Sequence, residues 1–126
     1  MDDITGPAKM LKIYIGESDR WRGKPLATAL VERLRAEGMA GATVLRGVEG
    51  FGAASRLHTA HILRLSEDLP LVVEVIDSPE RIARVLPIVD EMVGGGLVTV
   101  IDVEVVQYRH GTAGGPASGS REDDRG

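Results

Sequence analysis

The stretch GATVLRGVEGFGAASRLHTAH, residues 41–61, joins a predicted strand to a glycine-rich loop, and the fold is predicted from this junction outward. It begins with a predicted strand over Ala42–Val48, and Gly47, Gly50 and Gly52 then fall within six residues. Glycine permits a positive φ or a close approach by another group, so this spacing predicts a shaped loop at the strand end. Loops of this kind present backbone amides to anions, which makes an anionic ligand the first functional hypothesis.

A strand and a helix precede this junction. Met10–Gly16 alternates apolar and polar residues with a period of two, which predicts a strand with one buried face. Pro25–Glu37 repeats leucine every four residues, which predicts a helix with one apolar stripe, and Gly38 follows as its C-cap. Residues 1–9 are polar and lack a period, so they are expected to form a flexible leader.

A further strand and helix follow the loop. Leu71–Ile76 is rich in β-branched residues and predicts a central strand. Ser78 then precedes Pro79 as the N-cap of a helix whose apolar stripe ends at Val93. Pro87 lies inside this helix and predicts a kink or an interruption, because proline removes a hydrogen bond and clashes with the preceding turn.

Short stretches before and after the second helix complete the chain. His61–Leu65 alternates briefly and predicts a short strand or an arm. Gly94–Gly96 ends the helix, and Leu97–Tyr108 predicts the last strand. The alternation changes phase at Ile101–Asp102, which predicts a bulge or two consecutive short strands. Residues 109–126 are rich in glycine, serine and charge, so they are expected to form a disordered tail.

The predicted order of elements is β-α-β-β-α-β across residues 10–108. This order is typical of an α+β protein with a ferredoxin-like split βαβ fold, in which both helices cover one face of a four-stranded antiparallel sheet. The strands are apolar enough that the other face would expose a large hydrophobic patch in water. We therefore expect a homo-oligomer that packs these sheet faces together.

The composition favours one soluble domain and excludes several kinds of binding site. Of 126 residues, 43% are hydrophobic and 27% charged, which suits one soluble domain with a single core. A formal charge of −4 argues against nucleic-acid binding, which normally uses a basic surface. The absence of cysteine excludes disulfides and thiolate metal sites. No apolar run has the length of a signal peptide or a membrane span, so a cytoplasmic location is expected.

Three short motifs resemble the PII signalling superfamily. They are GVEGFG at 47–52, GGGLV at 94–98 and DVEVV at 102–106. The first resembles the GFG element that opens the regulatory T-loop of PII proteins, and the second resembles their glycine-rich B-loop. Longer blocks, among them IYIGESDRWRGKPL and GLVTVIDVEVV, are similar to the DUF190 family of PII-like proteins over Met10–Tyr108.

The resemblance implies a homotrimer of the PII-like fold that binds a small effector in clefts between subunits. It implies an adenine nucleotide such as ATP, ADP or AMP as effector, and no obligatory cofactor. The base of the T-loop and the B-loop would approach this ligand from neighbouring chains. The residues implied for this site are Gly47, Gly50, Phe51, Gly52, Gly94, Gly95 and Gly96.

The chain departs from the PII pattern in two ways. Leu97 follows the second glycine cluster where PII proteins carry a lysine, and the predicted loop contains no tyrosine for uridylylation. Arg46, or Arg22 and Lys24 from the RWRGK segment, are the candidates to supply the missing charge. Guanidinium and ammonium groups bind phosphate well, so these three residues join the predicted effector site.

His58 and His61, three residues apart, suggest an alternative. With His110 as a third ligand they would make a metal-handling trimer of the same fold, and a purely structural trimer is a further possibility. The HExxH arrangement is absent, so no metal site is assigned.

The favoured function is regulation of a partner. A ligand would order the Phe51–Ala60 loop by binding one loop state more tightly than the other. Family analogy implies a membrane transporter or channel as the regulated partner. No nucleophile, base and orienting group converge in the sequence, so catalysis is not predicted.

Overall fold

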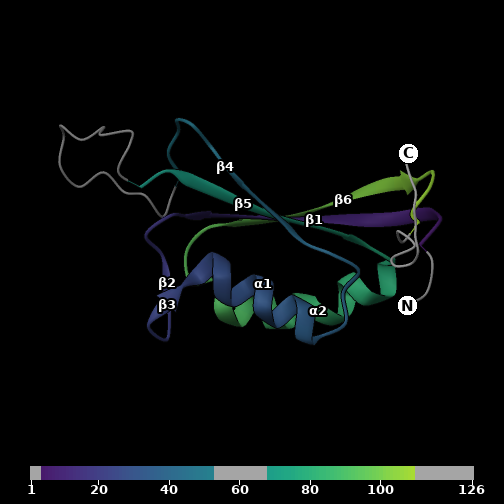
Figure 1. Ribbon diagram of the computed structural model, residues 1–126, viewed down its shortest axis with the longest axis horizontal. Helices are drawn as coiled ribbons and strands as arrows, with labels where there is room; N and C mark the ends of the chain where they lie inside the picture. The colour runs from purple at the N-terminus through teal and green to yellow at the C-terminus, as the bar shows by residue number, and fades with distance from the viewer. Residues whose placement is uncertain (1–3, 53–67, 110–126) are drawn as a thin grey trace, which may run out of the picture.

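The computed structural model describes residues 4–52 and 68–109, in which a sheet lies over two helices (Figure 1). The elements are β1 (Gly6–Gly16), β2 (Arg20–Trp21), β3 (Lys24–Pro25), α1 (Leu26–Ala36), β4 (Thr43–Arg46), β5 (Pro70–Asp77), α2 (Pro79–Met92) and β6 (Leu97–Val105). Four antiparallel strands pair in the order β4-β5-β1-β6, and β2 and β3 form a separate hairpin. The predicted ferredoxin-like split βαβ fold is confirmed.

Strand β1 is the centre of the sheet and begins earlier than predicted. It pairs with β5 over residues 9–16 and with β6 over residues 6–14. Ala8 is buried within this early part of the strand. The leader predicted over residues 1–9 was therefore wrong from Gly6 onward, because backbone pairing extends the strand where the side chains show no alternation.

Strand β6 pairs with β1 in one unbroken register, so the bulge predicted at Ile101–Asp102 was wrong. The pattern changes phase because β6 is an edge strand with apolar side chains on both faces. Val98 and Val100 point to the helix side, where they stay about two-fifths exposed. Asp102 follows them on that side and forms an ion pair with Lys9 of β1.

The core lies between the sheet and the two helices. Alternate side chains of β1 and β5 point toward the helices, and the leucine stripe of α1 faces them, as its four-residue spacing predicts. The fully buried apolar side chains are Leu11, Ile13, Leu30, Leu34, Val73, Val75, Ile82, Val85 and Val89.

Helix α2 begins as predicted but is not interrupted. The hydroxyl of Ser78 accepts a hydrogen bond from the backbone N–H of Arg81 at 3.2 Å, and Pro79 is the first helical residue. The helix then continues through Pro87 to Met92, so the predicted interruption was wrong. Buried valines on both sides of the proline pack into the core, and this packing outweighs the lost hydrogen bond.

Other element boundaries differ by small amounts. Helix α1 is one residue shorter at each end than predicted. Strand β4 is shorter than the predicted strand over residues 42–48, because Gly47 leaves the strand to pack against Pro70. The arm predicted at His61–Leu65 lies outside the described residues, as does the tail predicted over residues 109–126 apart from Arg109.

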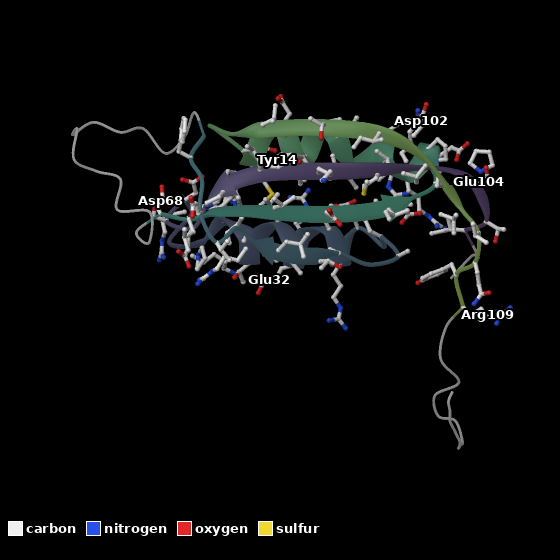
Figure 2. The ribbon with its side chains drawn as sticks, turned by 90° about the horizontal axis from the view of Figure 1, so that it is seen from above. Tyr14, Glu32, Asp68, Asp102, Glu104 and Arg109 are labelled. Carbon is white, nitrogen blue, oxygen red and sulfur yellow. The ribbon has the colours of Figure 1, made fainter. Side chains whose placement is uncertain are left out.

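The sheet face turned away from the helices, called here the open face, is apolar around a central ion pair. Its most exposed large apolar side chains lie between 41% and 55% exposed, and they are Leu45, Ile76, Leu97 and Ile101. Lys12 lies 3.6 Å from the Glu74 carboxylate and beside Tyr14, which Figure 2 labels. Tyr14, and to a smaller extent Glu74, raises the pKa of Lys12 above its ordinary value of 10.5, so the lysine stays charged there.

Candidate functional site

One end of the sheet carries both glycine-rich turns, and this end is the candidate functional site. Arg46 of β4 pairs with Leu71 of β5, and Leu71 pairs with Ile15 of β1. Continuing the β1–β6 register by one residue places Gly96 next to Ile15. In Figure 1 the end of β4, the start of β5 and the turn from α2 to β6 all lie at this end of the sheet.

The two turns lie at opposite edges of that end. The first follows β4 and the second precedes β6, and these are the two edge strands. Neighbouring strands lie about 4.8 Å apart, so three spacings separate the turns by roughly 14 Å. Within one chain the two turns therefore do not face each other across a narrow gap.

The first turn is packed against the start of β5. The backbone N–H of Gly47 donates to the carbonyl of Pro70 at 2.8 Å, and a Cβ on Gly47 would lie 2.8 Å from the Pro70 ring. Gly50 has a φ of +148°, and a Cβ there would lie 3.4 Å from the same ring. Both glycines are thus required by the turn itself, and the amide of Gly47 is occupied by Pro70.

Phe51 and Gly52 are the more accessible members of the predicted set. The Phe51 side chain is 75% exposed, and a Cβ on Gly52 would meet no heavy atom within 4 Å. An exposed phenylalanine in a chain with one Phe is available to a ligand or to another subunit.

The second turn, residues 94–96, presents exposed backbone. Gly94 has open space around it, whereas a Cβ on Gly96 would lie 2.5 Å from the carbonyl oxygen of Tyr14. Within the described residues, the amides of Gly94 and Gly95 donate no hydrogen bond. Unpaired amides in an exposed glycine turn are suited to an anion.

The turn after β1 holds both ends of the connection between β4 and β5. Arg46 forms an ion pair with Glu17, whose backbone N–H donates to Leu69 at 2.9 Å. Asp68 accepts hydrogen bonds from the backbone N–H and the hydroxyl of Ser18, at 2.9 and 2.8 Å. Figure 2 shows Asp68 at this end of the sheet. Glu17, Ser18 and Asp68 were not predicted as site residues, since nothing local in the sequence links positions 50 apart.

The structure places Arg22 and Lys24 on the β2–β3 hairpin. Lys24 forms an ion pair with Glu32 of α1 at 2.7 Å, and the Arg22 guanidinium lies 4.8 Å from the Trp21 ring centre. Both line a groove of about 350 Å³ against the helices. None of the predicted glycines lines this groove, and Figure 1 shows the hairpin below the sheet, beside α1.

Within residues 4–52 and 68–109 the structure contains no candidate metal site and no candidate membrane span. No group of three or more histidine, aspartate or glutamate side chains with metal-binding geometry occurs there. The histidine candidates His58, His61 and His110 lie outside those ranges. In the same ranges, no helix combines the length and the hydropathy that crossing a bilayer requires.

Two solved structures share this fold. A PII-like signaling protein from Thermus thermophilus superposes with a TM-score of 0.56 at 23% identity, over 84% of this chain and 94% of that one. CPII from Thiomonas intermedia K12, solved with ADP and bicarbonate, gives a TM-score of 0.53 at 23% identity, over 80% of this chain and 90% of that one. At this identity the likeness establishes the fold.

Sequence relatives are closer and cover the same domain. A UPF0166 protein of Aquifex aeolicus is 39% identical over 100 residues, which are 78% of this chain and 92% of the relative. A UPF0166 protein of Methanocaldococcus jannaschii is 38% identical over 99 residues, 78% of this chain and 91% of the relative. The family model of DUF190, described as Uncharacterized ACR, matches residues 8–105, which include the whole sheet from Ala8 onward and both glycine turns. This chain therefore belongs to the DUF190 family.

Proposed function

We propose that this chain is a cytoplasmic PII-like regulator, which forms a trimer, binds an adenine nucleotide between its subunits and controls a partner through the 51–60 loop. The observation that carries this proposal is the position of both glycine turns at one end of the sheet, on its two opposite edges. A membrane transporter or channel is the partner class we favour, by family analogy.

Contact between copies would complete the site. The two turns of one chain are roughly 14 Å apart across the sheet. If the β4 edge of one copy meets the β6 edge of the next, Phe51 and Gly52 come to lie opposite Gly94 and Gly95. The apolar open face supports such an assembly, because contact between copies would remove it from water.

The chemistry of the turns favours an anion. Gly94 and Gly95 offer exposed amides, and Arg46 offers a guanidinium whose side chain is 59% exposed. Its ion pair with Glu17 would be exchanged for a phosphate when ligand binds. CPII, which shares the fold, was solved with ADP and bicarbonate, so this nucleotide and this anion are the first to test.

Nucleotide binding should appear as thermal stabilisation. A ligand at about 100 times its dissociation constant adds roughly 2.7 kcal/mol per site, which corresponds to a shift of several degrees in Tm. We would measure thermal unfolding with ATP, ADP, AMP, ADP plus bicarbonate, and divalent cations alone. At least one nucleotide should raise the Tm of the unmodified chain.

Two glycine variants make the experiment specific for the site. Gly52→Asp places a carboxylate where phosphate is proposed and should abolish the shift. Gly41→Asp is the matched control, because it is also exposed with open space around it but lies at the other end of β4. If no nucleotide shifts the Tm, the effector assignment fails. A shift with divalent cations alone would favour the alternative based on His58 and His61.

The trimer has its own test on the open face. Ile101→Glu should convert a species of three copies into monomers in sedimentation velocity at about 10 μM, because burying an unpaired carboxylate costs several kcal/mol. Val106→Glu is the control, since Val106 is 86% exposed and lies just beyond β6. A monomeric unmodified chain, or a trimeric Ile101→Glu variant, would contradict the proposed assembly.

A further inference from the structure

The groove beside the β2–β3 hairpin is a second candidate binding surface, called here the hairpin groove. It is lined by Trp21, Arg22, Lys24, Ala29, Glu32, Arg33, Ala36 and Met92, and its volume is about 350 Å³. The floor is small and apolar where α1 and the end of α2 approach each other, and the rim is cationic. This surface shares no lining residue with the glycine turns.

The hairpin turn carries an arginine in a backbone conformation that arginine rarely adopts. Arg20 pairs with Pro25 and Trp21 with Lys24, so Arg22 and Gly23 are the two turn residues. Their φ angles are +48° and +86°, as a type I′ turn requires. Asn-Gly is the favoured sequence for this turn, so folding alone does not explain an arginine in its first position.

The charge of Arg22 is the least compensated in the groove. Lys24 is paired with Glu32 at 2.7 Å, and Arg33 with Glu37 at 3.1 Å. Among the described residues Arg22 has no ion pair, and its guanidinium stacks on Trp21 with the carbon 4.8 Å from the ring centre. A stacked guanidinium has its donors directed outward, where a carboxylate can accept two hydrogen bonds.

We propose that the hairpin groove docks an acidic segment of a partner protein. A carboxylate of the partner would bind Arg22, and an adjacent aliphatic side chain would occupy the apolar floor at Ala29, Ala36 and Met92. Charge complementarity supports this occupant, because a carboxylate of the partner would pair with the Arg22 guanidinium, which forms no ion pair with the described residues. Tryptophan and arginine are also the residues most enriched in interface hot spots.

A protein partner fits this surface better than a lipid surface does. Trp21 is half-buried, packs against the core and is covered on one face by Arg22. A membrane anchor would need this ring free to insert between headgroups.

Trp21 fluorescence provides a direct readout of binding in the hairpin groove, because Trp21 is the only tryptophan in the chain. The probe is the peptide acetyl-Glu-Glu-Asp-Leu-Glu-Glu-amide, which combines carboxylates with one leucine and contains no fluorophore. The matched probe replaces each acidic residue by its amide. We expect the acidic peptide to change Trp21 emission saturably, more weakly as salt is raised, and the amide peptide to leave it unchanged.

Arg22→Asn separates binding from folding. Asparagine suits a positive φ, so this variant should unfold at the same or a higher temperature than the unmodified chain. Its dissociation constant for the acidic peptide should rise at least about tenfold, as loss of a charged hydrogen bond predicts. Arg35→Gln is the control, because it removes an exposed charge of α1 outside the groove and should not change binding.

Three outcomes would overturn the proposal. They are equal binding of the acidic and amide peptides, equal binding by Arg22→Asn and the unmodified chain, and a Trp21 response to vesicles rich in phosphatidylserine with none to the peptide. The last would assign the hairpin to a membrane surface. The thermal shift of the unmodified chain with nucleotide is measured without the acidic peptide, so failure of peptide binding is distinguishable from failure of the nucleotide site.

Discussion

Asp77→Ala is expected to lower the free energy of unfolding by about 3–5 kcal/mol. Asp77 is 0% exposed at the junction of β5 and α2. One carboxylate oxygen accepts from the backbone N–H of Ser78 at 2.8 Å and from the guanidinium of Arg81 at 3.1 Å. The other accepts from the backbone N–H of Ala40 at 2.8 Å. Alanine would leave these donors without their buried acceptor, which costs more than the loss of an exposed ion pair.

Urea unfolding followed by circular dichroism would measure the effect. Asp90→Ala is the matched control, since Asp90 is an exposed carboxylate on the same helix, and it should change the free energy of unfolding by less than about 0.5 kcal/mol. A loss below about 1 kcal/mol for Asp77→Ala would mean that other groups replace the carboxylate. The Asp77 carboxylate would then not be the group that stabilises the contact between Ala40 and the start of α2.

Gly96→Ala should cost about 3 kcal/mol and distort the second glycine turn. Gly96 has a φ of +150°, which residues with a side chain rarely adopt, and an added Cβ would lie 2.5 Å from the carbonyl oxygen of Tyr14. That oxygen belongs to the central strand, so the turn must move instead. The expected result is a lower unfolding midpoint together with loss of any nucleotide-dependent shift in Tm.

Gly94→Ala is the control within the same turn. Gly94 has open space around it and no positive φ, so this variant should stay within about 0.5 kcal/mol of the unmodified chain. Equal losses for the two variants would show that the turn responds to flexibility in general rather than to the contact with Tyr14. Both variants can be compared in the same urea titration.

Periodicity and capping residues predicted most of the fold. The two-residue alternation of β1 and the four-residue repeat of α1 reflect burial on one face, so the sequence reports them directly. Ser78 and Pro79 located the start of α2 because an N-cap is a local interaction. These features need no information about distant parts of the chain.

Features that depend on neighbouring strands were missed. Residues 6–9 have no alternation, and their pairing with β6, joined at Lys9 by pairing with β5, makes them a strand. The phase change at Ile101–Asp102 suggested a bulge, although an edge strand with two apolar faces gives the same pattern without one. In both cases the deciding contact lies about 90 residues away.

The candidate site was predictable only in part. Both glycine clusters could be identified from composition, and the family resemblance paired them. Their positions at opposite edges of one sheet end follow from the strand order, which the sequence does not state. No strand pairing constrains where Arg22 and Lys24 lie relative to the glycine turns. The structure places both residues on the β2–β3 hairpin, beside α1.

The fixed ends of the connection between β4 and β5 limit the entropy cost of lengthening it. Gly47 is bonded to Pro70 and Ser18 to Asp68, so the two ends are fixed beside each other by the sheet itself. Closing a connection of twice the length between such ends costs only about 0.6 kcal/mol more. Insertions between Gly52 and Asp68 are therefore expected to leave the stability of the domain almost unaltered.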